Sequence, residues 1–527
     1  MAVEADHPAP TRVEISKRLL LVNSASSVVT KLISASVIVW LQQFLLRRIS
    51  DEEYSLLPVI SSVVVFLPLL TTVFSAGIGR YVTEAYARGD ERRVTQIVST
   101  MFPFHLATAL AIGVVGCALA WHVDRVLTIA PERVPEARIM LGLMVFSLVS
   151  SVAVAPFSVG LFVRQKFMWS SAIGLGQEFL RIGLIFVLLF GVSISIVWLV
   201  VASVSANLCG LVATQVVSRR LVPALKFRLS EIRWSLVRTL TSFGGWTILA
   251  QLGEMIRTGS DPILLNKFST PVNVNSFYIG SLPLGYMQGI SYAIQGPLLP
   301  QMTAMHAADA RDRLQSAYLR IGRYALWGAL LLAVPLMVFS REVILLYVGD
   351  AYADAAIVMV LLLAVFPVAY GHVMLGHLAN ATAQMRSWTL RAVAVQLVNL
   401  ALTLYLVGVL GMGAVGSALG TFLSMTLLWP VLNWPLGLRL VGLGWGRWFR
   451  ETLVPGLVPA VVSAVVCFTL KFTVAPATWL ALGLCAAAAM AVHGAVLWRF
   501  CLQPADRVDL AAVRTSLFRR WLGKTTG

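Results

Sequence analysis

Three charged residues interrupt a stretch that otherwise has the composition of a membrane-spanning helix. Glu254, Arg257 and Asp261 lie within the apolar segment 240–265. A charge near the bilayer centre costs at least about 2.5 kcal/mol, so these side chains must face protein or water rather than lipid. The guanidinium group can bind anions, and the carboxylates can bind cations or protons.

The polar residues of this segment recur at helical spacing. They are Thr247, Gln251, Glu254, Thr258 and Asp261. Intervals of three and four residues place them along one face of a helix, where their oxygen atoms could share a cation. Glu254 and Asp261, together with Glu178 in another segment, are candidate ligands of a coupling ion. Gln251 is a candidate substrate contact.

Basic residues deep inside apolar segments are candidates for binding an anionic substrate. Lys31, Arg181 and Arg257 are the three of this kind. Arginine binds phosphate oxygens through planar, bidentate contacts. The alternative is internal pairing, because Glu178 and Glu254 each stand three residues before an arginine. Lys31 has no acidic residue in its own segment, which makes it the strongest single candidate.

The elements that must position these residues are membrane helices. The chain is 58% hydrophobic and 12% charged, with a mean hydropathy of +0.82, whereas soluble domains carry about 25% charged residues. A span needs about 20 apolar residues, and fourteen segments qualify. They are approximately 19–46, 55–79, 94–121, 139–163, 169–191, 195–218, 240–265, 274–303, 321–340, 352–379, 388–410, 413–437, 452–470 and 477–498. Prolines 68, 283, 297, 367 and 430 are expected to interrupt four of them.

The net charge of +17 is unevenly distributed. If the N-terminus lies in the cytoplasm, inward-facing segments hold 30 of the 41 lysines and arginines and outward loops hold 8. This bias is the positive-inside rule, and it predicts that both termini are cytoplasmic. The basic balance therefore indicates topology and anionic lipid headgroups rather than nucleic acid.

The chain repeats itself with an offset of 220 residues. Thr247, Gln251 and Glu254 stand 220 positions after Ser27, Lys31 and Ser34, and the basic turn around residue 93 recurs around residue 313. Each half contains six spans, an even number, so both halves enter from the same side of the membrane. We expect two six-helix lobes in a parallel repeat, related by a pseudo-twofold axis along the membrane normal.

Local phrases of this repeat resemble one transporter superfamily. They are the segment 74–80 leading into 87–93, its later copy from 297 to 313, and the segment 345–352 ahead of the tenth span. With two six-span lobes and two further spans, the chain resembles the multidrug/oligosaccharidyl-lipid/polysaccharide (MOP) flippase superfamily over residues 15–440. Within it, the chain is most similar to the polysaccharide-export branch, the O-antigen-type flippases.

This resemblance implies a flippase for a lipid-linked oligosaccharide of the undecaprenyl-diphosphate type, working by alternating access in a bacterial inner membrane. Lys31, Arg181 and Arg257 would then bind the diphosphate, and H+ or Na+ would be the coupling ion. No other cofactor and no metal is expected. The expected partners are the substrate and membrane lipids, for a monomer that can associate with polysaccharide-assembly enzymes.

The fold class is thus an all-α polytopic membrane protein with fourteen transmembrane helices. The predicted parts are an N-terminal tail 1–18, a first lobe 19–218, a linker 219–239, a second lobe 240–437, two further spans within 452–498 and a basic tail 499–527. Two other functions stay open: a multidrug or small-molecule exporter, and a membrane-embedded polysaccharide polymerase or ligase. Short outward loops disfavour the enzyme, and a basic cavity disfavours cationic drugs.

Overall fold

The computed structural model describes residues 36–37, 39–69, 78–79, 81–86, 88–164, 166–237, 245–295, 302, 305–306, 308–503 and 506–507. Within these ranges the chain is helical and contains no β-strand. Lys31 and most of the first predicted span lie outside the described residues, as does most of the tail 499–527.

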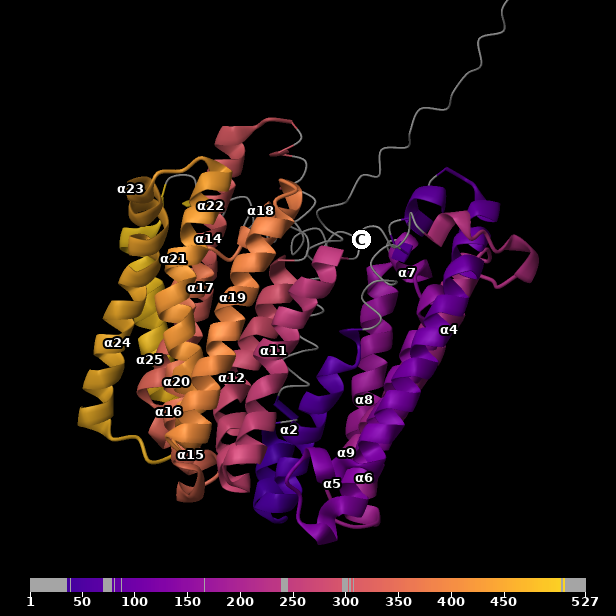
Figure 1. Cartoon of the computed structure of the whole chain (residues 1–527). Coiled ribbons are helices and arrows are strands. Elements are labelled where there is room, and N and C mark those ends of the chain that lie inside the picture. The colour runs from indigo at the N-terminus through magenta and orange to yellow at the C-terminus, as the bar shows by residue number, and fades with distance from the viewer. Residues whose placement is uncertain are drawn as a thin grey trace, which may run out of the picture.

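Among the described residues, the first half contains five long helices, and Figure 1 draws them in colours from indigo to magenta. They are α2 (Asp51–Phe66), α4 (Glu91–Trp121), α6 (Val134–Val154), α8 (Phe167–Gly191) and α9 (Val197–Leu221). Short helices connect them: α5 (Val123–Val126), α7 (Gly160–Val163) and the 3-10 turns Pro131–Arg133, Ala155–Phe157 and Leu229–Glu231. Helix α2 begins at a Ser50 cap and carries three acids in its first turn, which suits the positive end of the helix dipole.

The second half and the C-terminal pair form the larger group of helices. Its first part comprises α11 (Gly245–Phe268), α12 (Pro271–Gln295), α14 (Arg311–Val338), α15 (Ser340–Tyr347), α16 (Asp354–Leu363), α17 (Phe366–Tyr370) and α18 (Leu375–Ala381). It continues with α19 (Met385–Thr403), α20 (Gly413–Leu423), α21 (Trp429–Leu432), α22 (Trp434–Val441), α23 (Trp445–Trp448), α24 (Val454–Val474) and α25 (Trp479–Val496). Single π-helical turns follow α19, α20, α23 and α25, at Leu404–Val409, Ser424–Leu428, Phe449–Leu453 and Leu497–Cys501.

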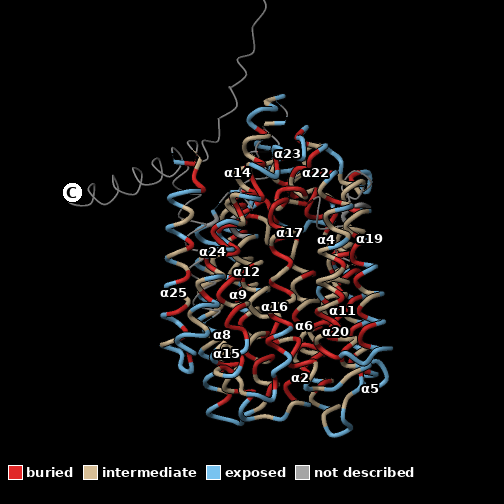
Figure 2. Tube along the Cα trace, turned by 90° about the vertical axis from the view of Figure 1, so that its left-hand side faces the viewer, coloured by how far each residue is buried: buried red, intermediate tan, exposed pale blue. Residues whose placement is uncertain are grey.

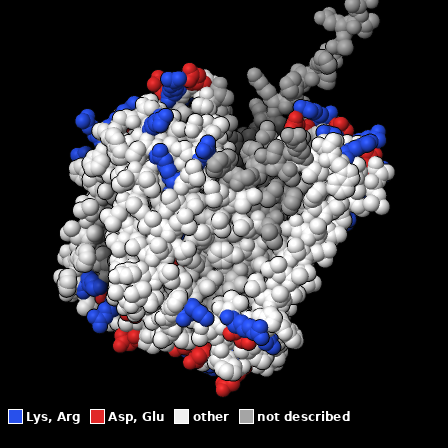
Figure 3. Space-filling view, viewed as in Figure 1, with Lys and Arg blue, Asp and Glu red and all other residues white. Residues whose placement is uncertain are grey.

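Ten helical segments among the described residues are long and apolar enough to cross a membrane, and they correspond to predicted spans three to six and nine to fourteen. The face in Figure 3 carries its charged groups toward its two ends, with an almost uncharged band between them. This distribution is that of a protein with a lipid-exposed belt. The chain is therefore a multi-pass membrane protein, and the sidedness of its termini stays a prediction.

The predicted repeat is visible in the spacing and packing of the helices. Helices α4 and α14 begin at residues 91 and 311, and α6 and α16 begin at residues 134 and 354, so each pair is 220 residues apart. Helix α6 packs against α2, α4 and α9, while α16 packs against the corresponding helices α12, α14 and α20. Each half thus repeats one set of neighbours, as duplication requires. The exact domain boundaries stay predictions.

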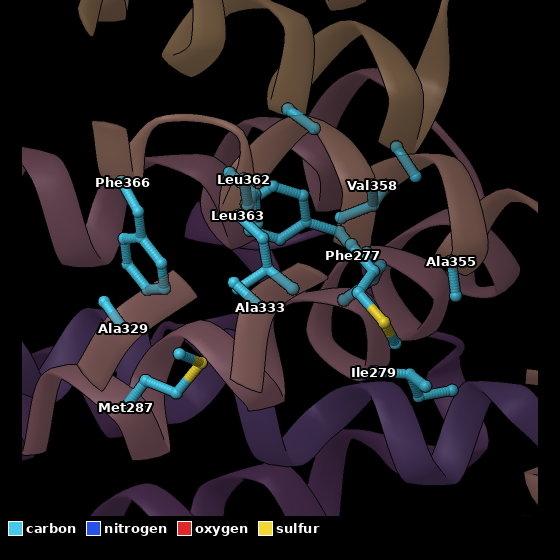
Figure 4. Packing of buried hydrophobic residues seen from close by; sticks show 14 of the residues in the cluster. Phe277, Ile279, Met287, Ala329, Ala333, Ala355, Val358, Leu362, Leu363 and Phe366 are labelled. Carbon is cyan, nitrogen blue, oxygen red and sulfur yellow. The ribbon is translucent and has the colours of Figure 1, made fainter. Parts of the chain in front are cut away.

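Close helix approach builds the buried core, which Figure 2 shows as red segments along the interior helices. In Figure 4 Phe277 and Met287 of α12 lie near alanines of α14 and aliphatic residues of α16. A Cβ atom on Gly280 would lie 2.6 Å from the carbonyl oxygen of Ala355, so only glycine allows α12 and α16 this contact. Small residues let membrane helices approach closely and gain van der Waals contacts. These contacts matter because no hydrophobic driving force acts between helices in lipid.

The predicted interruptions are confirmed in part. Helix α2 ends at Phe66 just before Pro68, α17 begins next to Pro367, and a π-helical turn precedes Pro430. The expected break at Pro283 is wrong, because α12 runs through it without a break. A proline costs one intrahelical hydrogen bond, and neighbouring helices can compensate for that loss.

Candidate functional site

Helix α11 carries the charged residues Glu254, Arg257 and Asp261. Arg257 donates from Nε to Oε2 of Glu254 at 2.9 Å and from Nη2 to Oε1 of the same carboxylate. The arginine side chain is 22% exposed and the glutamate side chain 45%. Both are thus partly accessible and form a bidentate pair within one helix, as the pairing alternative predicted.

Helix α8 carries a second pair of the same kind. Arg181 donates to Glu178, three residues earlier, and both side chains are partly exposed. Two tyrosines of α12 interact electrostatically with the two pairs: Tyr286 with the pair on α8, and Tyr292 with Arg257 on α11. The two ion pairs, one from each half of the molecule, therefore each lie within electrostatic range of a tyrosine of α12.

Asp261 occupies a different environment from Glu254. It is only 5% exposed, and its carboxylate faces the hydroxyl groups of Thr403 and Ser417. Oδ1 of Asp261 and both hydroxyl oxygens have no hydrogen-bond partner within the described part of the chain. A buried carboxylate beside two hydroxyl oxygens is a donor set that fits Na+ or a transferable proton, because both need oxygen atoms with free lone pairs.

Backbone irregularities surround this cluster. Thr403 is the last α-helical residue of α19, directly before a π-helical turn, and such turns are frequent at functional sites. A Cβ atom on Gly420 would lie 2.8 Å from Oγ1 of Thr403, so glycine brings α20 close to that hydroxyl. Pro262 lies inside α11 and cannot donate to the carbonyl of Thr258, which leaves that oxygen without its usual helical donor.

The polar face predicted for 240–265 thus consists of a partly exposed part and a buried part. Gln251 is half-buried, Glu254 pairs with Arg257, and Thr258 is exposed with its hydroxyl bonded to the Glu254 carbonyl at 2.9 Å. Asp261, one turn further along α11, is buried and faces Thr403 and Ser417 of the second half. Lys31 lies outside the described residues, so its place is not part of this geometry. The functional roles of all these residues stay predictions.

Asp51 joins the two halves at the end of the molecule that the positive-inside rule predicts to face outward. Its Oδ1 accepts hydrogen bonds from Nδ2 of Asn275, at 3.0 Å, and from the hydroxyl of Tyr352. Its carbonyl oxygen accepts from Asn275 as well, at 3.1 Å. Burial raises the pKa of Tyr352, which keeps that hydroxyl protonated as a donor.

Glu53, two residues later, anchors the same helix to the first half. Its Oε1 accepts from the backbone N–H of Ile196 at 2.9 Å, and its Oε2 lies 3.1 Å from Nη1 of Arg133. Two acids of one helical turn therefore hold α2 to both halves. Further hydrogen bonds between the halves lie at the same end: Gln42 to Tyr278, Gln43 to the Tyr347 carbonyl, Tyr347 to the Val39 carbonyl, and Asn266 with the backbone of Thr128.

Sequence reasoning missed the residues that complete these two sites. Thr403 and Ser417 carry no charge, so nothing distinguished them from other hydroxyls in apolar spans. A signal did exist for Asp51, since the acidic run 51–53 directly follows the first span. Its partners lie 224 and 301 residues away along the chain, and only the folded structure brings them together.

The sequence of the chain matches a family of polysaccharide biosynthesis proteins. The model of the family described as polysaccharide biosynthesis protein matches residues 18–306. A protein of Bacillus subtilis (strain 168), described as the uncharacterized membrane protein EpsK, is 20% identical over 416 residues, which cover 77% of this chain and 80% of that protein.

Solved structures share the fold. The lipid II flippase MurJ in an inward closed conformation matches with a TM-score of 0.64 and 13% identity, covering 92% of this chain and 99% of that chain. A multidrug resistance MATE transporter of the MOP superfamily, in its inward-facing conformation, matches with a TM-score of 0.61 and 13% identity, covering 82% and 97%. The expected resemblance to the MOP superfamily is confirmed, and the fold is shared with transporters and a flippase rather than with enzymes.

Proposed function

Because the chain belongs to the polysaccharide biosynthesis protein family, we propose that it is a flippase which moves a lipid-linked oligosaccharide from the cytoplasmic to the outer leaflet of a bacterial inner membrane. The family match carries this proposal, since it covers more than half of the chain. The fold shared with the lipid II flippase MurJ supports it, because the molecule named in that description is also a saccharide on a lipid carrier.

The substrate class proposed is an oligosaccharide on undecaprenyl diphosphate. Arg181 and Arg257 are partly exposed cations inside membrane helices, and each lies within electrostatic range of a tyrosine of α12. Each is held by a carboxylate three residues earlier, so a diphosphate would exchange with that carboxylate for the guanidinium group. The arginine would then leave its carboxylate only while substrate is bound. At other times the carboxylate would neutralise the charge of the arginine.

Replacing Arg257 tests this role. We expect Arg257→Ala to slow flipping at least about tenfold, the loss typical of a contact to a charged group. The assay uses purified protein in vesicles that contain a fluorescent undecaprenyl-diphosphate oligosaccharide, with a membrane-impermeant reductant reporting its leaflet. Lys267→Ala is the matched control, since Lys267 is an exposed base at the end of the same helix. Equal rates for the two variants would refute substrate binding by Arg257, and no flipping by the unmodified protein would refute the proposed function.

We further propose that an ion gradient drives the cycle through Asp261. The carboxylate, Thr403 and Ser417 supply the oxygen atoms, and the cluster lies within the half of the molecule that also contributes Arg257. Glu254 suits this role less well than the sequence suggested, because its carboxylate is already bound to Arg257. Binding of Na+ or H+ would neutralise Asp261 and change the packing of α11 against α19 and α20.

Alternating access requires the contacts at the predicted outer end to break. Asp51 accepts three hydrogen bonds from the second half, while Glu53 stays tied to the first. In this mechanism α2 moves with the first half when the outer end opens. The contacts around Asp51 therefore hold the molecule closed toward the outside.

Removing the Asp51 carboxylate is expected to favour outward opening. With roughly 1 kcal/mol for each lost hydrogen bond, Asp51→Ala should raise the outward-open fraction by about tenfold or more. Spin labels at exposed positions 132 and 350, one on each half, would report a longer distance in a background without the five native cysteines. Glu52→Ala is the control, because this neighbouring acid is exposed. An unchanged distance distribution in Asp51→Ala would show that these bonds do not close the outer end.

Export of small cations is the second candidate function. The fold is shared with a MATE transporter, and pairing of both arginines with carboxylates weakens the electrostatic argument against a cationic substrate. A cationic dye loaded into the same vesicles separates the two functions. Gradient-driven dye efflux without flipping of the labelled oligosaccharide would favour the exporter.

A further inference from the structure

An aromatic and basic segment connects α22 to α24. It comprises α23 and the π-helical turn that follows, with the sequence Trp-Gly-Arg-Trp-Phe-Arg-Glu-Thr-Leu over residues 445–453. Buried and exposed residues alternate at helical intervals within it, so one side faces the protein and the other faces outward. The segment is thus amphipathic, although it begins a membrane-spanning stretch, Trp445–Val474.

The inner side of the segment is firmly held. Trp448 is fully buried, stacks on His372 with a centroid separation of 4.3 Å, and donates from Nε1 to the carbonyl of Gly371 at 3.3 Å. Thr452 donates to the carbonyl of Leu319 at 3.0 Å. Trp448 therefore packs in the core of the protein. These contacts fix the orientation of the outer side.

The outer side lines a shallow pocket of about 480 Å³. Its walls are Trp445, Gly446, Phe449, Arg450 and Val454. The Trp445 and Phe449 side chains are 51% and 52% exposed. Two exposed aromatic rings beside a guanidinium group offer both an apolar wall and a charge to one ligand.

The charge of this pocket comes from Arg450 rather than from Arg447. Arg447 is neutralised by Glu451, with 3.0 Å between Nε and Oε1, and it also donates to Gln315 at 3.1 Å. Arg450 forms no ion pair with any residue in the described ranges. Figure 3 shows several basic groups and few acidic ones on the visible face toward the end where α23 lies. The pocket therefore attracts an anion.

The position of the pocket along the membrane normal indicates which class of anion it meets. The stretch that crosses the membrane begins at Trp445, and its partner Trp479–Cys501 ends at the same side with exposed Trp498 and Phe500. Exposed aromatic residues at this level mark the boundary between lipid tails and headgroups. The positive-inside rule assigns this side to the cytoplasm, where anionic lipids attract basic residues.

We propose that the pocket formed by Trp445, Gly446, Phe449, Arg450 and Val454 binds the headgroup of an anionic phospholipid of the inner leaflet. Arg450 contacts the phosphate, and the Trp445 and Phe449 rings pack against the glycerol and the upper acyl chain. The site is separate from Asp261 and Arg257, and it does not depend on the proposed transport activity.

Native mass spectrometry of the purified full chain tests the site. The protein is equilibrated with phosphatidylglycerol or with phosphatidylcholine, and the retained lipid is counted. We expect the chain to retain one phosphatidylglycerol more strongly than the rest, and Arg450→Gln to weaken that retention about fivefold, which corresponds to about 1 kcal/mol for one basic group at an anionic surface. Trp445→Ala should weaken it as well.

Arg447→Gln is the matched control, since it removes the same charge from the same segment but from a neutralised pair. It should retain phosphatidylglycerol like the unmodified chain. Equal retention by Arg450→Gln and the unmodified chain, or equal retention of phosphatidylcholine, would overturn the proposal. A melting temperature recorded for each variant shows that it is folded, and Arg450→Lys should restore part of the binding if the charge matters. Displacement of phosphatidylglycerol by undecaprenyl diphosphate at equimolar amounts would instead show that the pocket belongs to the transported lipid, and would also overturn the proposal.

Discussion

Asp261→Asn is expected to uncouple transport from the ion gradient. Asparagine keeps the size of the side chain but removes the charge that would hold a cation or accept a proton beside Thr403 and Ser417. Flipping driven by an imposed Na+ or proton gradient should fall at least about tenfold, the effect expected from losing a charged ligand. The measurement compares initial flipping rates in vesicles with and without the gradient.

A second measurement, independent of transport, identifies the ion. If Na+ binds, sodium chloride should raise the melting temperature of the unmodified protein relative to potassium chloride, and Asp261→Asn should abolish that increase. Thr403→Val and Ser417→Ala should weaken the response to Na+, because sodium needs these hydroxyl ligands. A proton needs the carboxylate above all, so gradient dependence that survives both hydroxyl variants but not Asp261→Asn indicates H+.

Glu254→Gln is the control for charge removal on α11. Its carboxylate already binds Arg257, and its side chain is 45% exposed, so the variant should fold and keep its response to the gradient. A gradient response that persists in Asp261→Asn would exclude coupling through this site. Loss of the response in Glu254→Gln alone would move the coupling role to Glu254, as the polar face of the sequence first suggested.

The contrast between Glu254 and Asp261 shows how far a polar face can be predicted. Their spacing is correct for one face of a helix, and both residues do lie on α11. What separates them is the set of neighbouring helices, because α19 and α20 cover Asp261 but leave Glu254 partly open. Helical periodicity describes one helix, whereas burial depends on helices that are more than a hundred residues away.

The membrane helices were the most predictable part of the fold. Long apolar segments satisfy their backbone hydrogen bonds internally, so length and hydropathy alone define them. Helices α11 and α12, by contrast, fall outside the ten strongly apolar segments. Their polar residues serve contacts between the halves, including Asn275 and Tyr278. A helix that carries polar contacts between the halves is thus less apolar than a purely lipid-facing one, and hydropathy alone identifies it less clearly.

Buried ion pairs between residues far apart in the sequence could not be predicted from the sequence. Arg323 stood near the start of a predicted span and Asp506 in a predicted basic tail, and neither was singled out. In the structure Nη2 of Arg323 lies 2.6 Å from Oδ1 and 2.7 Å from Oδ2 of Asp506, 183 residues away, and both side chains are fully buried. The tail therefore begins by docking against α14 rather than as a free segment.

Other groups add hydrogen bonds to this pair, although Nε of Arg323 has no partner within the described residues. The Tyr324 hydroxyl donates to Oδ1 of Asp506 at 2.6 Å, the backbone N–H of Gln503 donates to Oδ2 at 2.9 Å, and Arg323 donates to the carbonyl of Glu451. The guanidinium group also lies 5.4 Å from the centre of the Trp327 ring. One buried pair thus joins α14, the turn before α24 and the chain that follows α25.

Breaking this pair is expected to destabilise the protein strongly. Asp506→Ala leaves a buried arginine without its counter-ion, which typically costs about 3–5 kcal/mol. Glu342→Gln is the comparison, because its ion pair with Lys471, at 3.0 Å, is partly exposed and should contribute about 1 kcal/mol or less. Thermal unfolding in detergent should therefore show a much larger fall in the midpoint for Asp506→Ala.

Arg323→Met combined with Asp506→Leu should recover most of the loss, since two apolar side chains leave no buried charge. Equal midpoints for Asp506→Ala and Glu342→Gln would contradict a structural role for the buried pair, and failure of the double variant to recover would mean that the arginine's contacts to Glu451 and Trp327 stabilise the fold by themselves.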